Sequence, residues 1–466
     1  MRPDPLSHEI RPPHSPNSTL ERSGRGCTTD GISLSSPFTT PTPSACPDTT
    51  SPVAASTCSP RLDCRGNSRS LAGLVIAPGA RPEGPRLENI ANNYTPPSDD
   101  ARRLERRTAR YELRRTLWEV SDLPRLRNCG RARTGKHVGV RSTGDASGFS
   151  GLQSCGSVWA CPCCSAKVSA RRSIELGCGL LAWESSGGRV LMGTLTMRHH
   201  AGHRLTHEWD ALQDSWNSVT RSRIWKKWLA RLGSPGNVRV VEVTRSYSNG
   251  WHAHLHFVLL ISGDAGEDLE LVNDFRSWLL GKWSAALERH GFPGALDVGQ
   301  DVHLVEGVQA AAQLGEYLSK SAPYASGEAL GRELFGSWTK GARGVWSTVP
   351  VWRIAETFAA SGEVDLLDLW HEYEKASKGR RQVTWSKGLK ALLVQEQDKS
   401  DEEIAAEELG SVDLLRLDKH AWSLVLKQPW PTSRILDVLD KRGLSGLRAF
   451  LDANGIFYTL MEGNES

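Results

Sequence analysis

The sequence predicts an α+β fold in which a central antiparallel sheet is flanked by helices. Residues 238–247 and 257–261 are rich in apolar and β-branched side chains, which is typical of strands. Asn249-Gly250 between them signals a tight turn, so the two runs predict an antiparallel hairpin. Helical patterns at 206–232 and 268–290 surround this hairpin, which favours α+β over a parallel α/β sheet.

Other elements follow from the same kind of pattern. Residues 190–197 and 301–305 are predicted to be strands, and a helix is expected over 307–320. Beyond Ser347 the chain is predicted to be mostly helical. Two short helical patterns, 433–441 and 445–454, are separated by Gly443, and they fit either a helix-turn-helix DNA reader or a plain two-helix packing unit.

Composition divides the 466 residues into four segments. The first is rich in Ser, Thr, Pro and Gly and lacks periodicity, so it is predicted to be disordered. A basic helix and a cysteine-rich segment follow, then the central sheet, then a helical C-terminal region that could bind DNA. The expected boundaries are 1–100, 101–185, 186–346 and 347–466.

Two classes of protein are not expected. The chain has no apolar run of about 18 residues, so no membrane span is predicted. Its N-terminus lacks the apolar core of a secretory signal, which favours a cytoplasmic protein. In that reducing compartment the ten cysteines indicate metal ligands or free thiols rather than disulfides.

The second strand of the predicted hairpin begins with three histidines at alternating positions. His252, His254 and His256 share one face, because alternate side chains of a strand point to the same side. Glu242 on the partner strand can lie close to His254 or His256 across the hairpin. Two imidazoles and a carboxylate suit a Mg²⁺ or Mn²⁺ site with open positions. The alternatives are exposed histidines clustered by chance and a buried Glu242 that is satisfied by a neighbouring arginine.

A tyrosine and a lysine form the second candidate constellation. Tyr317 and Lys320 are three residues apart on the predicted helix 307–320, so they share a face. A nearby ammonium favours phenolate, which is a nucleophile toward phosphorus. A tyrosine and lysine at this spacing are also common on plain helix surfaces.

Cysteines form a third constellation. Cys155, Cys161 and Cys164 have zinc-like spacing, and Cys129 upstream supplies a fourth thiol. Cys163 could replace Cys161 or Cys164, although a Cys-Pro-x-Cys knuckle favours the latter two. A structural Zn²⁺ would fix a loop-rich segment that lacks a core. The alternative is a set of reduced buried cysteines.

Basic residues interleaved with Trp225 and Trp228 suggest a nucleic-acid surface. An ordinary solvated helix face is the alternative. The basic residues are Arg221, Arg223, Lys226 and Lys227.

Several of these motifs together resemble the HUH endonucleases, and in particular the rolling-circle replication initiators (Rep proteins) of actinobacterial plasmids. The resemblance covers roughly residues 125–405. The similar motifs are Gly193-Thr194-Leu195-Thr196, His254-Leu255-His256, Tyr317-x-x-Lys320, Cys155 to Lys167, Trp370-x-x-Tyr373-Glu374 and Lys378-Gly379-Arg380-Arg381.

The resemblance implies strand-specific nicking of plasmid origin DNA that is single-stranded at the nick. A metal held by His254 and His256, with His252 as an alternative ligand, would orient the scissile phosphate. Tyr317 would attack it, which leaves a 5′-phosphotyrosine and a 3′-OH primer, while Lys320 positions the phosphate. Host helicase and DNA polymerase would then extend the primer.

One position departs from the family pattern. Some of these initiators have an acid four residues before the tyrosine, where this chain has Gln313. Glu316 is adjacent but would point to another face of the helix. Two other functions fit the same residues: a relaxase or transposase of the same superfamily, and a zinc-stabilised DNA-binding protein without nuclease activity.

Overall fold

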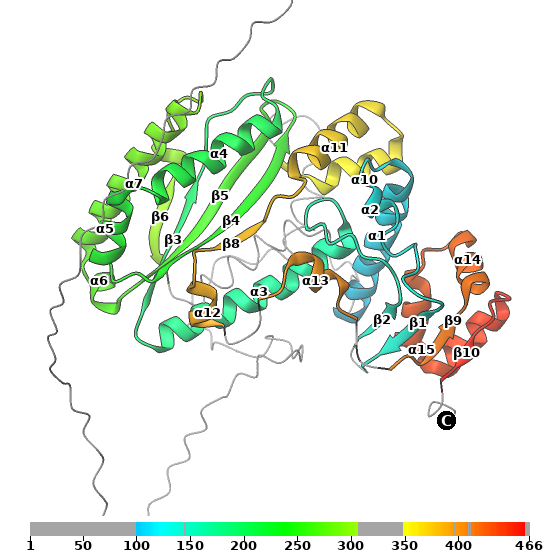
Figure 1. Cartoon of the computed structure of the whole chain (residues 1–466). Helices are drawn as coiled ribbons and strands as arrows, with labels where there is room; N and C mark the ends of the chain where they lie inside the picture. The colour runs from blue at the N-terminus through cyan, green and yellow to red at the C-terminus, as the bar shows by residue number, and fades with distance from the viewer. Residues whose placement is uncertain are drawn as a thin grey trace, which may run out of the picture. The chain divides into compact units, whose positions relative to one another are not determined.

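The computed structural model describes residues 99–143, 146–305, 348–394, 398–408, 410 and 412–461. The predicted α+β class is confirmed, with antiparallel sheets flanked by helices (Figure 1). Residues 1–98, nearly all of the segment predicted to be disordered, lie outside the described residues. Within the described part, no helix has the length and apolar character needed to cross a membrane.

The helices and strands run in the following order along the chain. The helical elements are α1 (Asp99–Val120), α2 (Pro124–Arg127), α3 (Pro162–Ser185), α4 (Leu205–Thr220), α5 (Arg223–Arg231), α6 (Gly263–Glu267), α7 (Leu269–Arg289), η1 (Asp297–Gly299), α10 (Trp352–Ser361), α11 (Val364–Ser377), α12 (Leu389–Leu393), α13 (Asp401–Ala406), α14 (Lys419–Lys427) and α15 (Ser433–Ala453). The strands are β1 (Val138–Ser142), β2 (Ser147–Ser150), β3 (Arg189–Leu195), β4 (Gly236–Ser246), β5 (Gly250–Ile261), β6 (Asp301–Val305), β7 (Thr348–Pro350), β8 (Val383–Trp385), β9 (Leu415–Leu417) and β10 (Thr459–Leu460).

The larger sheet is antiparallel and has the order β6-β3-β5-β4-β7, with β8 also paired to β4. The predicted hairpin forms its centre, since β4 and β5 pair from Gly236↔Leu260 to Ser246↔Gly250. The turn occupies residues 247–249, and Gly250 follows it with a φ of 76°. A side chain at Gly250 would also meet the backbone of Ala201 at 2.8 Å, so this turn requires glycine.

The two faces of the larger sheet carry different helices. Leu255, Phe257 and Leu259 of β5 belong to the main core, which also includes buried side chains of α4, α5 and α7. Val258 and Leu260 point the other way, into a smaller core with α3 and α12. Because strand residues alternate, the histidines of β5 lie on the same face as Val258 and Leu260. Figure 1 shows the two helical layers.

Close packing explains the glycine in the motif Gly193-Thr194-Leu195-Thr196. Gly193 of β3 pairs with Phe257 of β5. A Cβ atom at position 193 would lie 2.3 Å from the Phe257 ring, so any larger residue would displace it. Thr194 therefore keeps its place beside His256, which is its partner in the sheet register.

The helix predicted over 206–232 is broken, and two helices farther along the chain are separated by a glycine. The predicted helix 206–232 divides into α4 and α5, and the hydroxyl of Ser222 caps α5 by accepting from the backbone N–H of Trp225. Gly362 separates α10 from α11 with a φ of 74°. In both places the apolar periodicity continues, but the helix ends because a capping side chain or a left-handed glycine stabilises its terminus.

A second, four-stranded sheet joins segments that are far apart in the sequence. Its order is β10-β9-β1-β2, so strands from 138–150 pair with strands from 415–460. The short strands β8, β9 and β10 were not predicted, because two or three residues cannot show the alternation of a strand. This sheet has a core of its own, which includes Val138, Leu417 and Trp422.

A buried carboxylate connects α11 to the end of α1. Glu374 is fully buried, and its Oε1 accepts from the Ser121 hydroxyl at 2.6 Å and from the Trp370 indole N–H at 2.9 Å. Its Oε2 accepts from the backbone N–H of Asp122 at 2.9 Å. Glu374 and Trp370 belong to the motif Trp370-x-x-Tyr373-Glu374, so the structure gives that motif a role in packing.

We expect Glu374→Ala to lower the free energy of unfolding by about 4 kcal/mol, because it leaves three donors without an acceptor in a buried place. Glu374→Gln keeps one carbonyl oxygen for Ser121 and Trp370, so it should cost about half as much. Urea unfolding followed by tryptophan fluorescence measures both values. Equal losses for the two variants would contradict this account of Glu374.

Candidate metal centres

The hairpin register brings an acid and two histidines together. Glu242 of β4 is paired with His254 of β5, and His256 is the next residue on the same face of β5. The Nε2 atoms of His254 and His256 each lie 3.1 Å from Oε2 of Glu242. All three side chains are buried.

These distances fit a shared metal ion. Two ligands at right angles on an octahedral ion, with bonds of about 2.1 Å, are about 3 Å apart. The donor set of two imidazole nitrogens and one carboxylate oxygen suits a divalent cation and leaves positions for other ligands. The group Glu242, His254 and His256 can therefore hold a metal ion.

The charge distribution in this group also favours a cation. Burial alone would raise the pKa of Glu242, but hydrogen bonds and positive charge from His254 and His256 outweigh it and hold the pKa well below the usual range. Glu242 is therefore ionised at neutral pH. Its negative charge lies between two imidazole nitrogens, where a cation would be attracted.

Thr194 orients one of the two histidines. Its hydroxyl lies 2.9 Å from Nδ1 of His256, on the side of the ring away from Glu242. When a cation occupies the centre, Nδ1–H can donate to this hydroxyl, which leaves the Nε2 lone pair of His256 for the ion. The sequence motif containing Thr194 was recognised, but this role depends on the pairing of β3 with β5 and could not be derived from it.

His252 is held by a different partner and lies outside the close group. The His199 Nδ1–H donates to the carbonyl of Asn249 at 2.9 Å, so Nε2 of His199 accepts from Nδ1–H of His252 at 2.7 Å. Burial, followed by the nearby charge of His254, lowers the pKa of His252 to about 3. His252 is thus neutral with a defined tautomer, and its part as an alternative ligand stays a prediction.

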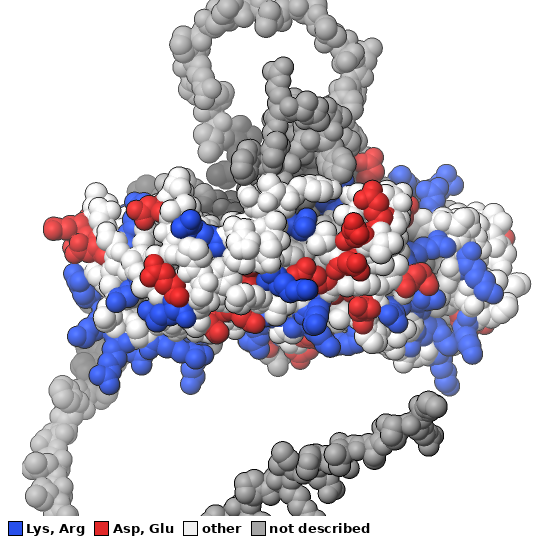
Figure 2. Space-filling view, turned by 90° about the horizontal axis from the view of Figure 1, so that it is seen from above, with Lys and Arg blue, Asp and Glu red and all other residues white. Residues whose placement is uncertain are grey.

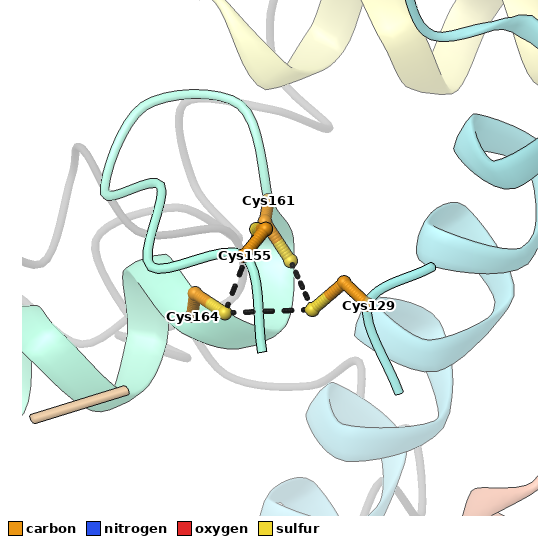
Figure 3. A group of neighbouring side chains, drawn as sticks. All are labelled: Cys129, Cys155, Cys161 and Cys164. Atoms are coloured by element: carbon orange, nitrogen blue, oxygen red, sulfur yellow. Dashed lines mark hydrogen bonds between the residues drawn. The ribbon is translucent and has the colours of Figure 1, made fainter. Parts of the chain in front are cut away.

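The four predicted cysteines also meet. Cys129 follows α2, Cys161 caps the start of α3, and Cys164 lies in the first turn of α3 (Figure 3). Sγ of Cys129 lies 3.6 Å from Sγ of both Cys161 and Cys164, and Sγ of Cys155 lies 3.7 Å from Sγ of Cys164. The Sγ of Cys163 is directed instead toward the carbonyl of Arg110.

These sulfur separations fit a tetrahedral metal–thiolate centre. Bonds of about 2.3 Å from a central ion place the ligand sulfurs about 3.8 Å apart. Hydrogen bonds from the other cysteines, Cys155 first, hold the pKa of Cys129 well below its usual value, whereas burial raises that of Cys161. One thiolate thus forms readily, and the set of four can hold a metal ion.

Arg114 is a buried charged residue, electrostatically coupled to the cysteines, that the sequence analysis did not single out. It is buried on α1, and its guanidinium lies 4.3 Å from the ring centre of Tyr111 and 5.5 Å from that of Trp118. Burial would lower its pKa, but negative charge on neighbouring groups, Cys163 first and Cys129 among them, raises it above the usual value. Arg114 therefore supplies positive charge to the cysteine cluster. The sequence could not indicate this, because Arg114 is one of many arginines on a helix that was predicted only to be basic.

The predicted DNA-binding residues do not join either centre. Arg221, Arg223, Lys226 and Lys227 are exposed at the end of α4 and on α5. Through Trp225 and Trp228, α5 packs on α7, in the layer that covers the face of the sheet opposite to Glu242 and the histidines. Contact of these four residues with DNA stays a prediction.

Tyr317 and Lys320 lie outside the described residues, as do Gln313 and Glu316. The strand β6 precedes them in the sequence. It pairs with β3, and its first residue, Asp301, lies opposite Thr194. Their roles also stay predictions.

Comparison with known proteins identifies the segment that carries the sheet and part of the cysteine cluster. Residues 152–287 match the family model described as Replication protein. This segment is similar to the replication proteins that the model describes. The predicted resemblance to Rep initiators is thereby confirmed, and Glu242, His254 and His256 all lie within the matched residues.

Two curated proteins are similar to this chain. One is named Protein rep, from Streptomyces lividans, and is 27% identical over 296 residues, which cover 52% of this chain and 64% of that protein. The other is named Neomycin resistance protein, from Streptomyces cyanogenus, and is 31% identical over 148 residues, 27% of this chain and 34% of that protein. The chain thus matches less than two thirds of either relative. No solved structure matches it.

Replacing Thr194 should weaken metal binding at the Glu242 centre. We expect Thr194→Val to lower the affinity for Mn²⁺ about 10- to 100-fold, the usual effect of losing the hydrogen bond that orients a ligand histidine. Isothermal titration with Mn²⁺ measures the affinity.

Thr244→Val is the matched control, because Thr244 pairs with His252 on the same sheet face and its buried hydroxyl has no hydrogen-bond partner among the described residues. It should bind Mn²⁺ like the unchanged protein. Equal affinities of the Thr194 and Thr244 variants would refute the role of Thr194.

Proposed function

We propose that this chain is the rolling-circle replication initiator of a plasmid, and that it nicks one strand of the origin through an HUH-type active site. The observation that carries the proposal is the group Glu242, His254 and His256 on a Rep-family sheet. Its donor set suits Mg²⁺ or Mn²⁺, which bind phosphate oxygens at open positions. A buried site of this kind selects one phosphate of a single strand.

The chemistry needs few groups from the chain. When bound, the cation supplies positive charge to the scissile phosphate as charge builds up in the transition state. Glu242 and His254 fix the position of that charge, while Thr194 holds the ring of His256. Because these residues lie on adjacent strands of one sheet, the site is pre-organised and needs little rearrangement during the reaction.

Tyr317 is the proposed nucleophile. Its phenolate oxygen bonds to phosphorus as the bond from phosphorus to the 3′ oxygen breaks. The tyrosine proton passes to solvent, and the departing 3′ oxygen takes up a proton to become the 3′-OH primer. The Lys320 ammonium favours the phenolate and contacts the phosphate. The protein stays attached to the 5′ end as a phosphotyrosine.

The topology supports this assignment of Tyr317. Asp301 of β6 pairs with Thr194 at the level of the metal centre, and Val305 pairs with Val190 four residues farther along the sheet. The chain thus leaves β6 about 13 Å from that level. The chain from Val305 to Tyr317 is long enough to return over this distance, since an extended residue spans about 3.3 Å.

We propose that Zn²⁺ occupies the cysteine cluster. A tetrathiolate site of this geometry is typical of structural zinc, and it leaves no position for substrate. Zinc with four thiolates carries a net charge of −2, so the buried cation of Arg114 would offset part of it. The ion would hold Cys129 and Cys155, in loops that lack regular structure, against the start of α3.

The partners follow from the proposed reaction. Plasmid origin DNA is the substrate, single-stranded at the nick, and the new 3′-OH is handed to a host helicase and DNA polymerase. The site of action is then the cytoplasm, where the plasmid replicates.

Nicking can be tested with a supercoiled plasmid that carries the origin of this replicon. In the presence of Mn²⁺ we expect open circles with covalently attached protein, seen as label retained after denaturing electrophoresis. Tyr317→Phe should reduce nicking more than 1,000-fold, because it removes only the attacking oxygen.

Tyr324→Phe is the matched control, since it removes another tyrosine hydroxyl from the same part of the chain and should nick normally. Unchanged plasmid topology with the unaltered protein would favour a DNA-binding protein without nuclease activity. Normal nicking by the Tyr317 variant would show that the nucleophile is a different residue.

Metal analysis tests the zinc proposal. We expect about one zinc per chain, and we expect the double variant Cys161→Ser with Cys164→Ser to lose it, because two of four thiolates cannot hold zinc firmly. Cys163→Ser is the matched control and should keep its zinc, since its thiol is directed away from the cluster. Zinc that survives the double substitution would refute this ligand set.

A further inference from the structure

The loop between Cys155 and Cys161 extends from the cysteine cluster toward the Glu242 centre. It contains neither helix nor strand, and both of its ends are cysteines of the cluster. A metal ion bound to the cluster would therefore fix the two ends of the loop. Trp159 lies within the loop and is buried, so the same ion would also fix the position of Trp159.

Trp159 contacts residues from distant parts of the chain. Its indole N–H donates to the carbonyl of Arg380 at 2.8 Å, and its own carbonyl accepts from the Tyr373 hydroxyl at 3.3 Å. Its ring meets the Trp209 ring edge-on, with 4.8 Å between the ring centres. Tyr373 in turn stacks on Trp251, at 6.1 Å between ring centres. Since Trp251 directly precedes the three histidines of β5, one side chain connects the loop to the strand that carries the histidine ligands.

The loop also reaches the other strand of the hairpin, at a gap in the outer edge of β4. The strand β7 pairs with residues 244–246 of β4 and β8 pairs with residues 238–240, so neither strand pairs with residues 241–243. Glu242 is in the middle of this gap. A cavity beside Glu242 is bordered by three aromatic side chains, and its lining residues include Trp159, Glu242, Thr244, Trp352 and Tyr373.

Both metal centres lie below the surface. Figure 2 shows acidic and basic side chains interspersed over one face of the molecule, whereas the candidate ligands of both centres are buried. Water and salt screen exposed charges, so an influence of one centre on the other has to pass through buried contacts. The contacts of Trp159 with Tyr373 and with the cavity beside Glu242 are of this kind.

We propose that Trp159 couples the two centres, so that a metal ion at the cysteines raises the affinity of the Glu242 centre for Mn²⁺. With the loop fixed, Trp159 packs beside the gap in β4 and keeps the Glu242 carboxylate in position for an octahedral ion. Without the ion at the cysteines, the loop loses its restraint and Glu242 loses lateral support. Trp159 is thus a positioning residue that touches neither ion.

The proposal rests on the two metal assignments and not on the nicking reaction. Coupling between two binding sites is reciprocal, so an ion at the Glu242 centre must raise the zinc affinity of the cysteines by the same factor. A residue that only stabilises the fold would not produce this reciprocal effect.

Substitutions at Trp159 test its role in the zinc-loaded full chain, with Mn²⁺ affinity measured by isothermal titration. We expect Trp159→Ala to lower the affinity for Mn²⁺ at least about tenfold, the usual effect of losing a residue that supports a metal ligand, while the zinc content stays the same. Trp159→Phe keeps an aromatic ring beside the gap and should retain most of the affinity. Unchanged Mn²⁺ affinity in Trp159→Ala would overturn the proposal.

Trp225→Ala is the matched control. Trp225 is buried to a similar extent, but its aromatic neighbours are Trp216, Phe275 and Trp278 of α4 and α7. This variant should lose stability as Trp159→Ala does and still bind Mn²⁺ like the unchanged protein. Equal losses of Mn²⁺ affinity in the two variants would refute a specific role for Trp159.

The double variant Cys161→Ser with Cys164→Ser tests the dependence on zinc. It should lower Mn²⁺ affinity about as much as Trp159→Ala, and adding Trp159→Ala to it should cause little further loss, because both changes release the same loop. Cys163→Ser should keep its zinc and bind Mn²⁺ normally. Full Mn²⁺ affinity in the zinc-free double variant, or losses that multiply, would refute the coupling.

Reciprocity gives an independent test. Zinc affinity, measured by competition with a zinc-binding dye, should rise at saturating Mg²⁺ by the factor by which zinc raises the affinity for Mg²⁺. Glu242→Gln and Trp159→Ala should each abolish this rise. A zinc affinity that Mg²⁺ leaves unchanged would overturn the proposal, and because no measurement uses DNA, that result would leave the proposed nicking reaction standing.

Discussion

The register of the β4–β5 hairpin is the constraint on which the candidate active site depends. The turn at residues 247–249, closed by Gly250, sets Glu242 opposite His254. A slip by one residue would turn the histidines into the main core and move Leu255 and Phe257 out of it, to the opposite face of the sheet. The burial of those apolar side chains therefore holds the metal ligands in place, and most of the stability of the site comes from the opposite face of the sheet.

The two candidate metal centres use this architecture in different ways. The Glu242 centre lies on paired strands, so its geometry exists before an ion binds. The cysteine centre joins two loops to the start of α3, where no sheet or helix pairing holds Cys129 or Cys155. The four cysteines belong to the main core, so an ion there would bind these loops to it, with Arg114 as the buried counter-charge. Neighbouring donor atoms fit an octahedral ion in the first case and a tetrahedral one in the second.

Much of the site could be predicted because its residues are close in the sequence or lie across a short turn. Strand alternation placed the three histidines on one face, and the hairpin brought Glu242 to them. Cysteine spacing selected the four thiols that meet. By contrast, Thr194 and His199 reach the histidines across strand β3 and the loop that follows it. No local pattern encodes such contacts, because they depend on which strand becomes the neighbour of β5.

The sequence by itself determined the α+β class, the hairpin and both sets of candidate ligands, because strand alternation, turn chemistry and ligand spacing are local properties. Only the tertiary structure decided that β1 pairs with β9, that Glu374 connects α11 to the end of α1, and that the acids of α15 turn toward Arg107. These contacts join residues hundreds of positions apart. They form because burying apolar surface and pairing buried charges stabilises one global arrangement, which no short window of sequence specifies.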